Sequence, residues 1–348
     1  MSKFIFRIFW VISLIIFASI FITPQFFWLT GVLSLLIPLV IIMHLAFLVY
    51  FVIKPSNKIW YSITVLAVGL LFLSRTISLH GPIEGEGSLS VLSYNVRVFN
   101  VYSHLNKNFE ISKSTIQWTI NRDDDVLCLQ EFYYEPNSEI FNTLEILSKD
   151  YPHFHFQPKA TNQIGAQFGM AIFSKHPIID QGSLDITRHS MNDILFTDLN
   201  LGSDTVRIYN VHLESMSIDE NQLTNSNSEN FSQNLGELFS QLRYGFSQRA
   251  AQIDKLCDHI QGSPYPVILT GDLNDVPYSY SYQKLKKYLH SSFENAGKGF
   301  GFTFNGKLFF LRIDNQFYSE DLEIKKFQTL RKVKYTDHFP IYGEYSFD

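Results

Sequence analysis

The first 83 residues contain no aspartate or glutamate, and this feature most constrains what the chain can fold into. Three apolar stretches fill the region, over residues 4–22, 26–53 and 60–79. A helix needs roughly 20 apolar residues to cross a bilayer, so we expect about three transmembrane helices within residues 1–80. His44 is expected to be a packed or interfacial histidine. A cleaved signal peptide is the alternative for the first stretch, although no small-residue cleavage site follows it.

The basic residues of this region indicate how its helices cross the membrane. Lys3 and Arg7 flank the first stretch, and Lys54 and Lys58 lie between the second and the third; only Arg75 opposes this pattern. Cytoplasmic loops are enriched in lysine and arginine, so three crossings place the rest of the chain outside the cytoplasm. We therefore expect an integral membrane protein with an extracytoplasmic C-terminal domain, periplasmic in a Gram-negative cell.

The rest of the chain has a different composition. Residues 84–348 carry all 33 acidic residues and 23 of the 28 basic ones, which gives this part a formal charge of −10. Glycines and a proline mark residues 81–87 as a linker, and residues 88–348 are enough for one large domain with its own core. Cys128 and Cys257 lie in apolar or helical contexts, so buried thiols are expected, with one disulfide as the alternative.

Strand-like and helix-like segments alternate in this second part, which favours an α/β or mixed-sheet class. A hairpin is expected across Gly202-Ser203-Asp204, and the segment over 215–232 has the composition of a mobile loop. The other expected strands lie at 89–96, 126–130, 170–173 and from Val267 onward, and the expected helices at 110–120, 138–147 and 235–260.

Polar residues whose side chains could take part in catalysis lie at or near the ends of these strands. A single Asn or Glu at such a place is more often a turn or a cap. Together, however, they supply carboxylates that bind cations or accept protons, and amides and imidazoles that donate to phosphate oxygens. This set suits metal-assisted hydrolysis of phosphate esters, and its members are Asn95, Glu131, His212, Asp272, Asn274, Asp314, Asp337 and His338.

The motifs around these residues resemble the ordered series of the endonuclease/exonuclease/phosphatase superfamily, the deoxyribonuclease I-like proteins. The resemblance covers about residues 88–347 and implies an α/β sandwich of two packed sheets with outer helices, four layers in all. The motifs that carry it are Ser93-Tyr94-Asn95-Val96, Leu129-Gln130-Glu131, Gly169 to Ser174, Asn210-Val211-His212-Leu213, Gly271-Asp272-Leu273-Asn274, Arg312-Ile313-Asp314 and Thr336-Asp337-His338.

The resemblance also implies a bound cation. Glu131 would be the principal ligand of Mg²⁺ or Mn²⁺, with Asn95 and Asp337 assisting, and hard oxygen ligands are what such ions prefer. Many nucleases of the family carry an acidic residue two positions after the first-strand Asn. Arg97 occupies that position here, which puts a second metal site in doubt.

The remaining motif residues would act on the substrate. Asp272 would orient or deprotonate the attacking water, and Asn274 would hold the phosphate. His338, paired with Asp314, and His212 would donate hydrogen bonds to the transition state.

Two further features are ambiguous. Arg249 could reach a phosphate from its helix, or it could be a solvated helical arginine. Asp123-Asp124-Asp125 looks like an acidic metal cluster, but its position before a buried strand favours a solvated turn.

These observations favour a membrane-anchored, divalent-metal-dependent phosphoric ester hydrolase. The alternatives are an endonuclease or exonuclease acting on DNA or RNA, and a catalytically silent membrane-anchored binding module. The expected partners are a phosphoester substrate and, through the N-terminal helices, the lipid bilayer; no protein partner is inferred. The charge of −10 handicaps non-specific nucleic-acid binding, so a lipid or small phosphodiester is the preferred substrate class.

Overall fold

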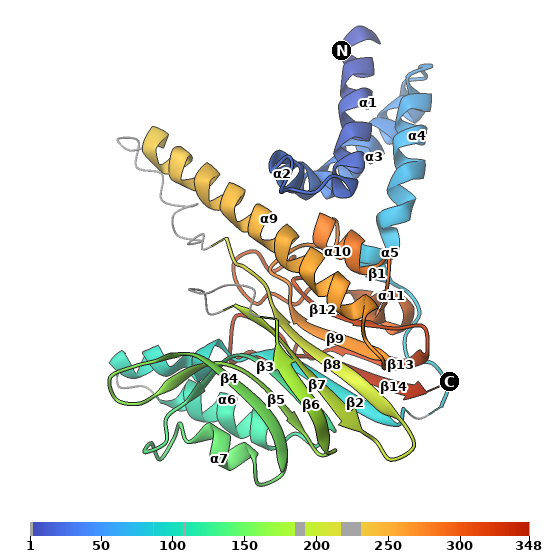
Figure 1. Ribbon diagram of the computed structural model, residues 1–348. Helices are drawn as coiled ribbons and strands as arrows, with labels where there is room; N and C mark the ends of the chain where they lie inside the picture. The colour runs from blue at the N-terminus through green and yellow to red at the C-terminus, as the bar shows by residue number, and fades with distance from the viewer. Residues whose placement is uncertain (1–2, 86, 107–108, 185–191, 217–230, 348) are drawn as a thin grey trace. The chain divides into compact units, whose positions relative to one another are not determined.

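The computed structural model describes residues 3–85, 87–106, 109–184, 192–216 and 231–347 (Figure 1). The chain forms two compact units. The first unit comprises residues 1–77, 215–254 and 275–287, and the second comprises residues 78–214, 255–274 and 288–348. Of the loop expected over 215–232, residues 217–230 lie outside the described residues.

The N-terminal region of the first unit is helical, as its apolar sequence predicts. Two stretches, 3–21 and 59–76, are long and apolar enough to cross a membrane, and a bent pair of helices makes a third if it counts as one span. The helices of this region are α1 (Lys3–Ala18), η1 (Ser19–Phe21), α2 (Leu29–Leu35), α3 (Ile37–Ile53), α4 (Ile59–Gly69), η2 (Leu70–Phe72) and α5 (Leu73–Thr76).

Two boundaries differ from the expected ones. The second stretch is not one straight helix, because α2 and α3 meet at an angle of 44°. Pro38 lies in the first turn of α3, where its ring removes a backbone N–H and clashes with the preceding turn. The third helix ends at Thr76 and not near Leu79, since the next two residues form the short strand β1 (Ile77–Ser78).

His44 joins three helices within this unit. Its side chain is fully buried. Its Nε2 atom lies 3.0 Å from Ser13 Oγ on α1, and its Nδ1 atom lies 3.3 Å from Ser62 Oγ on α4. Such polar contacts tie apolar helices together, so the packed alternative for His44 is confirmed.

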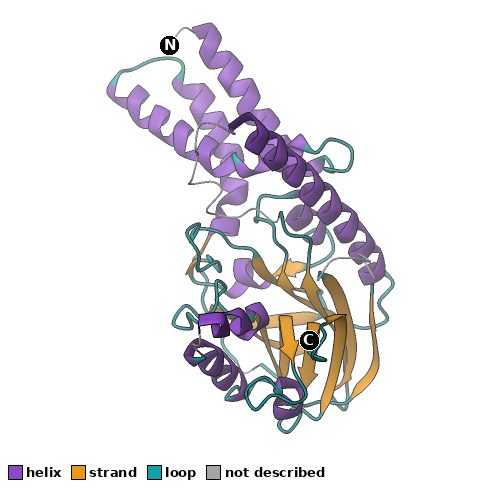
Figure 2. Cartoon of the chain, turned by 90° about the vertical axis from the view of Figure 1, so that its left-hand side faces the viewer, coloured by secondary structure: helices purple, strands orange, loops and turns teal. Residues whose placement is uncertain are grey.

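The second unit contains two six-stranded sheets, whose strands are orange in Figure 2. Sheet I has the order β10 (His290–Ser291), β12 (Asp314–Tyr318), β9 (Val267–Asp272), β8 (Thr205–His212), β7 (Asp193–Asn200) and β6 (Ile178–Ser183). Sheet II has the order β13 (Leu322–Thr329), β14 (Ile341–Phe347), β2 (Leu89–Asn95), β3 (Val126–Tyr134), β5 (Gln167–Ser174) and β4 (His153–Thr161).

The sheets pack face to face over a core drawn from both. Val91, Cys128 and Ile172 of sheet II belong to the same buried cluster as Ile208 and Ile268 of sheet I. The alternation of side chains along each strand allows one row of apolar residues to face the other sheet.

A buried polar contact also crosses between the sheets. Gln130 Nε2 donates to Asn210 Oδ1 at 2.7 Å, and Asn210 Nδ2 donates to the carbonyl oxygen of Leu129 at 3.1 Å. Buried amides that satisfy one another in this way fix how one sheet lies on the other.

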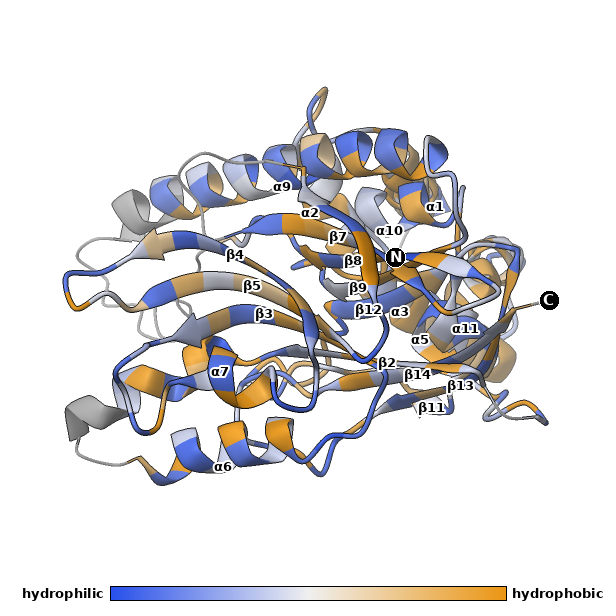
Figure 3. Cartoon of the chain, turned by 60° about the horizontal axis from the view of Figure 1, so that its bottom comes forward, coloured by the Kyte–Doolittle hydropathy of each residue, from blue (hydrophilic) through white to orange (hydrophobic). Residues whose placement is uncertain are grey.

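Helices cover the outer faces of the sheets. Helices α6 (Glu110–Ile120) and α7 (Thr143–Leu147) pack on sheet II, on the side away from β7, β8 and β9 (Figure 3). The last residues of α9 (Phe231–Gln261) lie against sheet I, where Tyr209 Oη is 2.6 Å from His259 Nδ1. The short elements η3 (Arg97–Asn106), α10 (Tyr280–Leu285), α11 (Ser292–Ala296) and β11 (Gly299–Phe300) complete the assignment.

The expected two-sheet arrangement with outer helices is therefore confirmed. The helix expected over 138–147 is shorter, because α7 starts only at Thr143 and the residues before it form turns. Both cysteines are buried free thiols, so the disulfide alternative is wrong.

Candidate active site

The site lies where the two parallel strand pairs end. In each sheet one pair is parallel, β8 with β9 and β2 with β3. Parallel neighbours end at the same edge of a sheet. This brings His212 into register with Asp272 in sheet I and Asn95 into register with Gln130 in sheet II.

A glycine allows β9 to deliver Asp272 beside His212. Gly271 has φ of +141°, and a Cβ atom at this position would lie 2.0 Å from the carbonyl oxygen of Val211. Only glycine permits this approach of β9 to β8. After the strand, Asn274 takes a positive φ of 49°, and its backbone N–H donates to Asp272 Oδ1 at 2.8 Å. The turn thus holds Asp272, and the Asn274 side chain donates to the Leu213 carbonyl at 2.9 Å.

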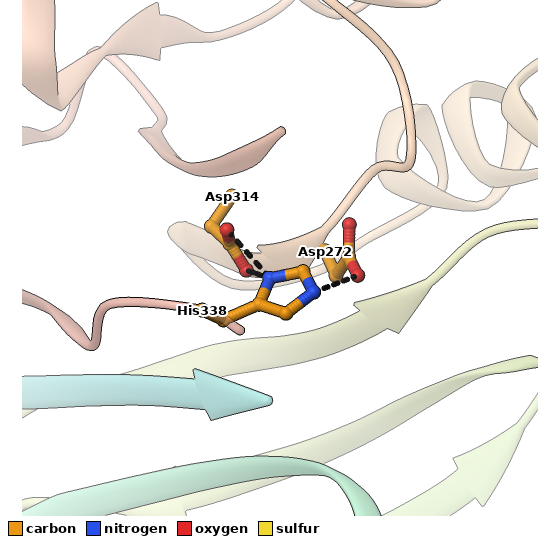
Figure 4. A group of neighbouring side chains, drawn as sticks. All are labelled: Asp272, Asp314 and His338. Atoms are coloured by element: carbon orange, nitrogen blue, oxygen red, sulfur yellow. Dashed lines mark hydrogen bonds and ion pairs between the residues drawn. The ribbon is translucent and has the colours of Figure 1, made fainter. Parts of the chain in front are cut away.

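His338 lies between two buried carboxylates (Figure 4). Its Nδ1 atom is 3.0 Å from Asp314 Oδ2, and its Nε2 atom is 3.7 Å from Asp272 Oδ2. Burial lowers the pKa of His338, but the charges of Asp314 and Asp272 outweigh burial and raise this pKa to about 10. The imidazole is therefore held in its protonated, donating form near neutral pH.

Glu131 faces the site because β3 is irregular at this point. The register of β3 against β5 shifts between Leu129 and Phe132, and Glu131 has a positive φ of 50°. Such a bulge turns a side chain out of the regular alternation, as often happens beside active sites. Asn95 Nδ2 donates to Glu131 Oε1 at 3.0 Å and to Asp272 Oδ2 at 3.2 Å, so it links the ends of the two sheets.

His212 completes the group. Its Nε2 atom lies 3.8 Å from Glu131 Oε1 and 3.8 Å from Asp272 Oδ2. The side chain is buried, so the imidazole is fixed at the inner wall of the site. The side chains of six predicted residues are thereby joined by short distances, and they are Asn95, Glu131, His212, Asp272, Asp314 and His338.

Asp337 lies beside Arg97, and its expected role in holding a metal ion stays a prediction. Its Oδ2 atom lies 3.5 Å from Arg97 Nε, and both side chains are partly exposed. Thr336, the residue before it, donates its hydroxyl to the carbonyl oxygen of Asn95 at 3.1 Å. The backbone of this segment is thus tied to the end of β2, while the carboxylate of Asp337 forms an ion pair with Arg97.

Arg249 belongs to the first unit. It is fully buried, which contradicts the solvated alternative, and its Nε atom lies 3.5 Å from Asp275 Oδ2. Its expected contact with phosphate remains a prediction.

The triplet before β3 is not a simple solvated turn. Asp124 is buried and accepts two hydrogen bonds from Arg122, at 2.6 and 2.7 Å, because a buried carboxylate requires such a partner. Asp123 does fit the solvated expectation, since its side chain is fully exposed.

Two supporting residues were not found from the sequence. Thr303 Oγ1 accepts the backbone N–H groups of Ile313 and Asp314, both at 3.1 Å, and so fixes the start of β12. The ring of Phe304 meets the ring of His338 edge-on, with centroids 5.6 Å apart. Their segment is rich in phenylalanine, but nothing in that composition indicates contact with His338.

The site has the donor atoms for a metal ion. One ligand atom each from Asp272, Asp314 and His338 lies within 4.8 Å of the others, which makes this trio a candidate metal group. The side-chain oxygens of Asn95 and Glu131 form a second group of hard ligands, and the two side chains are joined by a hydrogen bond from Asn95 Nδ2 to Glu131 Oε1 at 3.0 Å.

Comparison with known families agrees with this geometry. The model of the endonuclease/exonuclease/phosphatase family matches residues 92–338, so the chain belongs to this family. The family defines a class of phosphoester hydrolases, and the site contains the acidic residues and histidines that such chemistry uses. A second family model, for a domain of unknown function, matches residues 2–76. No curated protein matches the chain.

Solved structures share the fold at low sequence identity. An endonuclease/exonuclease/phosphatase from Beutenbergia cavernae is 16% identical, with a TM-score of 0.50 over 74% of this chain and 71% of that one. A family member from Leptotrichia buccalis is 17% identical, with a TM-score of 0.50 over 75% of this chain and 100% of its own. One from Bacteroides vulgatus is 15% identical, with a TM-score of 0.50 over 75% and 99%.

Proposed function

We propose that this chain is a membrane-anchored, divalent-cation-dependent hydrolase of phosphoric esters. The observation that carries the proposal is the position of His338 between Asp314 and Asp272, with Asn95 joining Asp272 to Glu131. In this proposal a protonated donor, a carboxylate base and an oxygen-rich cation site would act together where the strand ends of the two sheets meet. A binding module has no need of such a buried charged group, which is costly to desolvate.

The cation is proposed to bind at Glu131. The Glu131 side chain is 33% exposed and is hydrogen-bonded to the Asn95 side chain. The oxygens of these two side chains are the kind of ligand that a hard divalent ion prefers. Asp337 would assist, in competition with Arg97. When bound, Mg²⁺ or Mn²⁺ would neutralise charge on the phosphate oxygens.

The residues of the chain have separable roles in this proposal. Asp272, held by Asn95 and the Asn274 backbone, would orient a water molecule and accept its proton. His338 would donate from Nε2 to the developing charge, while Asp314 keeps the ring oriented and protonated. His212 would add a second donor, and the Asn274 amide would contact the phosphate.

The preferred substrate is a lipid-borne or small phosphodiester. Residues 84–348 carry a formal charge of −10, which weakens binding to long polyanions, since such binding relies on many Lys and Arg contacts. The apolar N-terminal helices would hold the site close to a bilayer and raise the effective concentration of membrane phosphoesters. The alternative is a nuclease that uses a local basic rim.

The test is a parallel assay of the full chain in lipid nanodiscs. Phospholipid, a generic water-soluble phosphodiester, duplex DNA and RNA are supplied with Mg²⁺, and again with a chelator. We expect Mg²⁺-dependent release of product, fastest from the lipid or the small diester. Rapid DNA cleavage without turnover of the small substrates would reverse the choice of substrate, and full activity in chelator would contradict the metal role.

A binding measurement distinguishes the two candidate metal groups. Calorimetric titration with Mn²⁺ is performed on Glu131→Gln and on Asp314→Asn. Loss of binding in Glu131→Gln with retention in Asp314→Asn is expected. The reverse pattern would place the ion among Asp272, Asp314 and His338.

A further inference from the structure

Residues 299–311 form an aromatic segment that the proposed chemistry does not use. The segment connects α11 to β12 and contains five phenylalanines in 13 residues. Three of them are exposed, Phe300 by 48%, Phe309 by 65% and Phe310 by 52%. A cluster of large exposed aromatic side chains marks a surface that binds a partner or a membrane.

This segment is fixed to the catalytic residues. The Thr303 carbonyl accepts the Phe339 N–H at 2.7 Å, and the Asn305 N–H donates to the Asp337 carbonyl at 2.7 Å. Phe304 packs its ring against His338. Whatever Phe309 and Phe310 contact is therefore held close to the reacting centre.

Basic side chains accompany the exposed rings. Lys307 is exposed within the segment, and Arg331, Lys332 and Lys334 are exposed on the turn that leads to Thr336-Asp337-His338. The Arg331 guanidinium lies 5.8 Å from the centre of the Phe302 ring and also donates to the Phe300 carbonyl. This concentration of positive charge runs against the negative net charge of residues 84–348.

Aromatic rings beside Lys and Arg match the interface of an anionic bilayer. Phenylalanine and other aromatic side chains bury themselves at the level of the headgroups, and Lys and Arg pair with lipid phosphates. Single-stranded nucleic acid would use aromatic faces as platforms for successive bases. The Phe309 and Phe310 rings stand at 81° to each other, so they do not offer two parallel faces to stacked bases.

We propose that residues 299–311 dock on the anionic surface of the bilayer, with Phe309 and Phe310 inserted and Lys307 and Arg331 on lipid phosphates. The same chain carries candidate membrane helices, which would tether it to a bilayer. Docking would bring lipid phosphoesters to His338, and this last step alone rests on the proposed function.

The deciding experiment places a label on the tip of the segment. The native cysteines Cys128 and Cys257 are fully buried, so Phe309→Cys supplies the reactive thiol for a polarity-sensitive fluorophore. The full chain is reconstituted in nanodiscs of phosphatidylcholine and phosphatidylglycerol, with and without lipids that carry a nitroxide quencher near the headgroup. The matched control is Ile164→Cys, 64% exposed on the turn between β4 and β5.

Docking predicts a blue shift and quenching of the label at position 309, and neither at position 164. Equal, water-like emission at both positions would overturn the proposal. A shift that requires added oligonucleotide, without quenching by the labelled lipid, would also overturn it and would favour a nucleic-acid partner.

Activity then tests what docking does. In the double variant Phe309→Asp, Phe310→Asp, the ratio of the rate on bilayer lipid to the rate on a soluble diester should fall at least about tenfold, which corresponds to about 1.4 kcal/mol. Ile164→Asp should leave the ratio unchanged. A quenched label with no lipid hydrolysis would support docking and remove the lipid substrate of the proposed function. An unchanged ratio in the double variant would contradict delivery of lipid by this segment.

Discussion

At the scale of single residues, the proposed chemistry depends on one imidazole held between two carboxylates. His338 has a raised pKa because Asp314 and Asp272 stabilise its charged form more than burial penalises it. A histidine with a folded-state pKa of about 10, above its ordinary value of 6.5, stabilises the fold fully below about pH 6.5. That contribution is lost as the pH rises toward about 10.

The variant Asp314→Asn removes the closer of these two charges. We expect the pKa of His338 to fall, so the alkaline decline in hydrolysis rate should move from near pH 10 to a lower pH. The measurement is the pH–rate profile on a soluble phosphodiester. Asp123→Asn, which alters a fully exposed carboxylate, is the control and should leave the profile unchanged. If the rate of Asp314→Asn declined at the same alkaline pH as wild type, Asp314 would not be what raises the pKa of His338.

At the scale of secondary structure, the sequence was most informative where strands are apolar and end in polar motifs. The strands that carry Asn95, Asp272 and His212 were all predicted, because an apolar run followed by a turn residue is a local signal. The bulge that turns Glu131 toward the site was not predictable, since it arises from the pairing of β3 with β5. Likewise β14 pairs with β2, which lies far from it in the sequence. Strands β4 and β13 pair with their chain neighbours β5 and β14, but their mixed polar and apolar sequences gave no clear strand signal.

The contacts within the site also exceed what a sequence can indicate. Asn95 and Asp272 lie 177 positions apart in the chain, yet Asn95 Nδ2 donates to Asp272 Oδ2 at 3.2 Å. The resemblance to a family supplied their roles, whereas distances and partners required the fold. The pairing of Asp337 with Arg97 and the support of His338 by Phe304 are long-range contacts of this kind.

The approach of β9 to β8 gives a prediction at this scale. Gly271→Ala adds a Cβ atom 2.0 Å from the Val211 carbonyl at a positive φ, so we expect a loss of stability of about 2 kcal/mol or more and a lower rate. Gly236→Ala makes the same chemical change in α9, where the added atom meets no neighbour within 4 Å. It should stabilise the protein by up to about 1 kcal/mol. Chemical denaturation of both variants in detergent checks these opposite signs, and equal stabilities would contradict the close approach.

At the scale of the whole molecule, an acid-free apolar region precedes a hydrolase domain. Arg75, the one basic residue that opposed the expected orientation, is buried within the first unit. Its guanidinium donates to the Pro277 carbonyl at 3.1 Å and to Gln283 Oε1 at 2.5 Å. These hydrogen bonds explain why an arginine stands at this position. Arg75 therefore does not count against the expected orientation in the membrane.

The expected orientation leads to a prediction for the intact chain. A reporter that works only in the cytoplasm should be inactive when fused after Asp348 and active when inserted between Lys54 and Lys58, because basic loops stay inside. Western blotting controls for expression of both fusions. The opposite pattern would refute either three crossings or their direction.

The central claim is that His338 works with Asp272 and Glu131 in phosphoester hydrolysis. The most direct measurement is the Mg²⁺-dependent rate of the full chain on a soluble phosphodiester, for wild type and for His338→Ala. We predict a loss of at least about a hundredfold, the scale of removing a transition-state donor, with a denaturation curve that still shows a folded protein. Asp123→Asn should retain the wild-type rate. A correctly folded His338→Ala protein with near wild-type activity would contradict the site assignment.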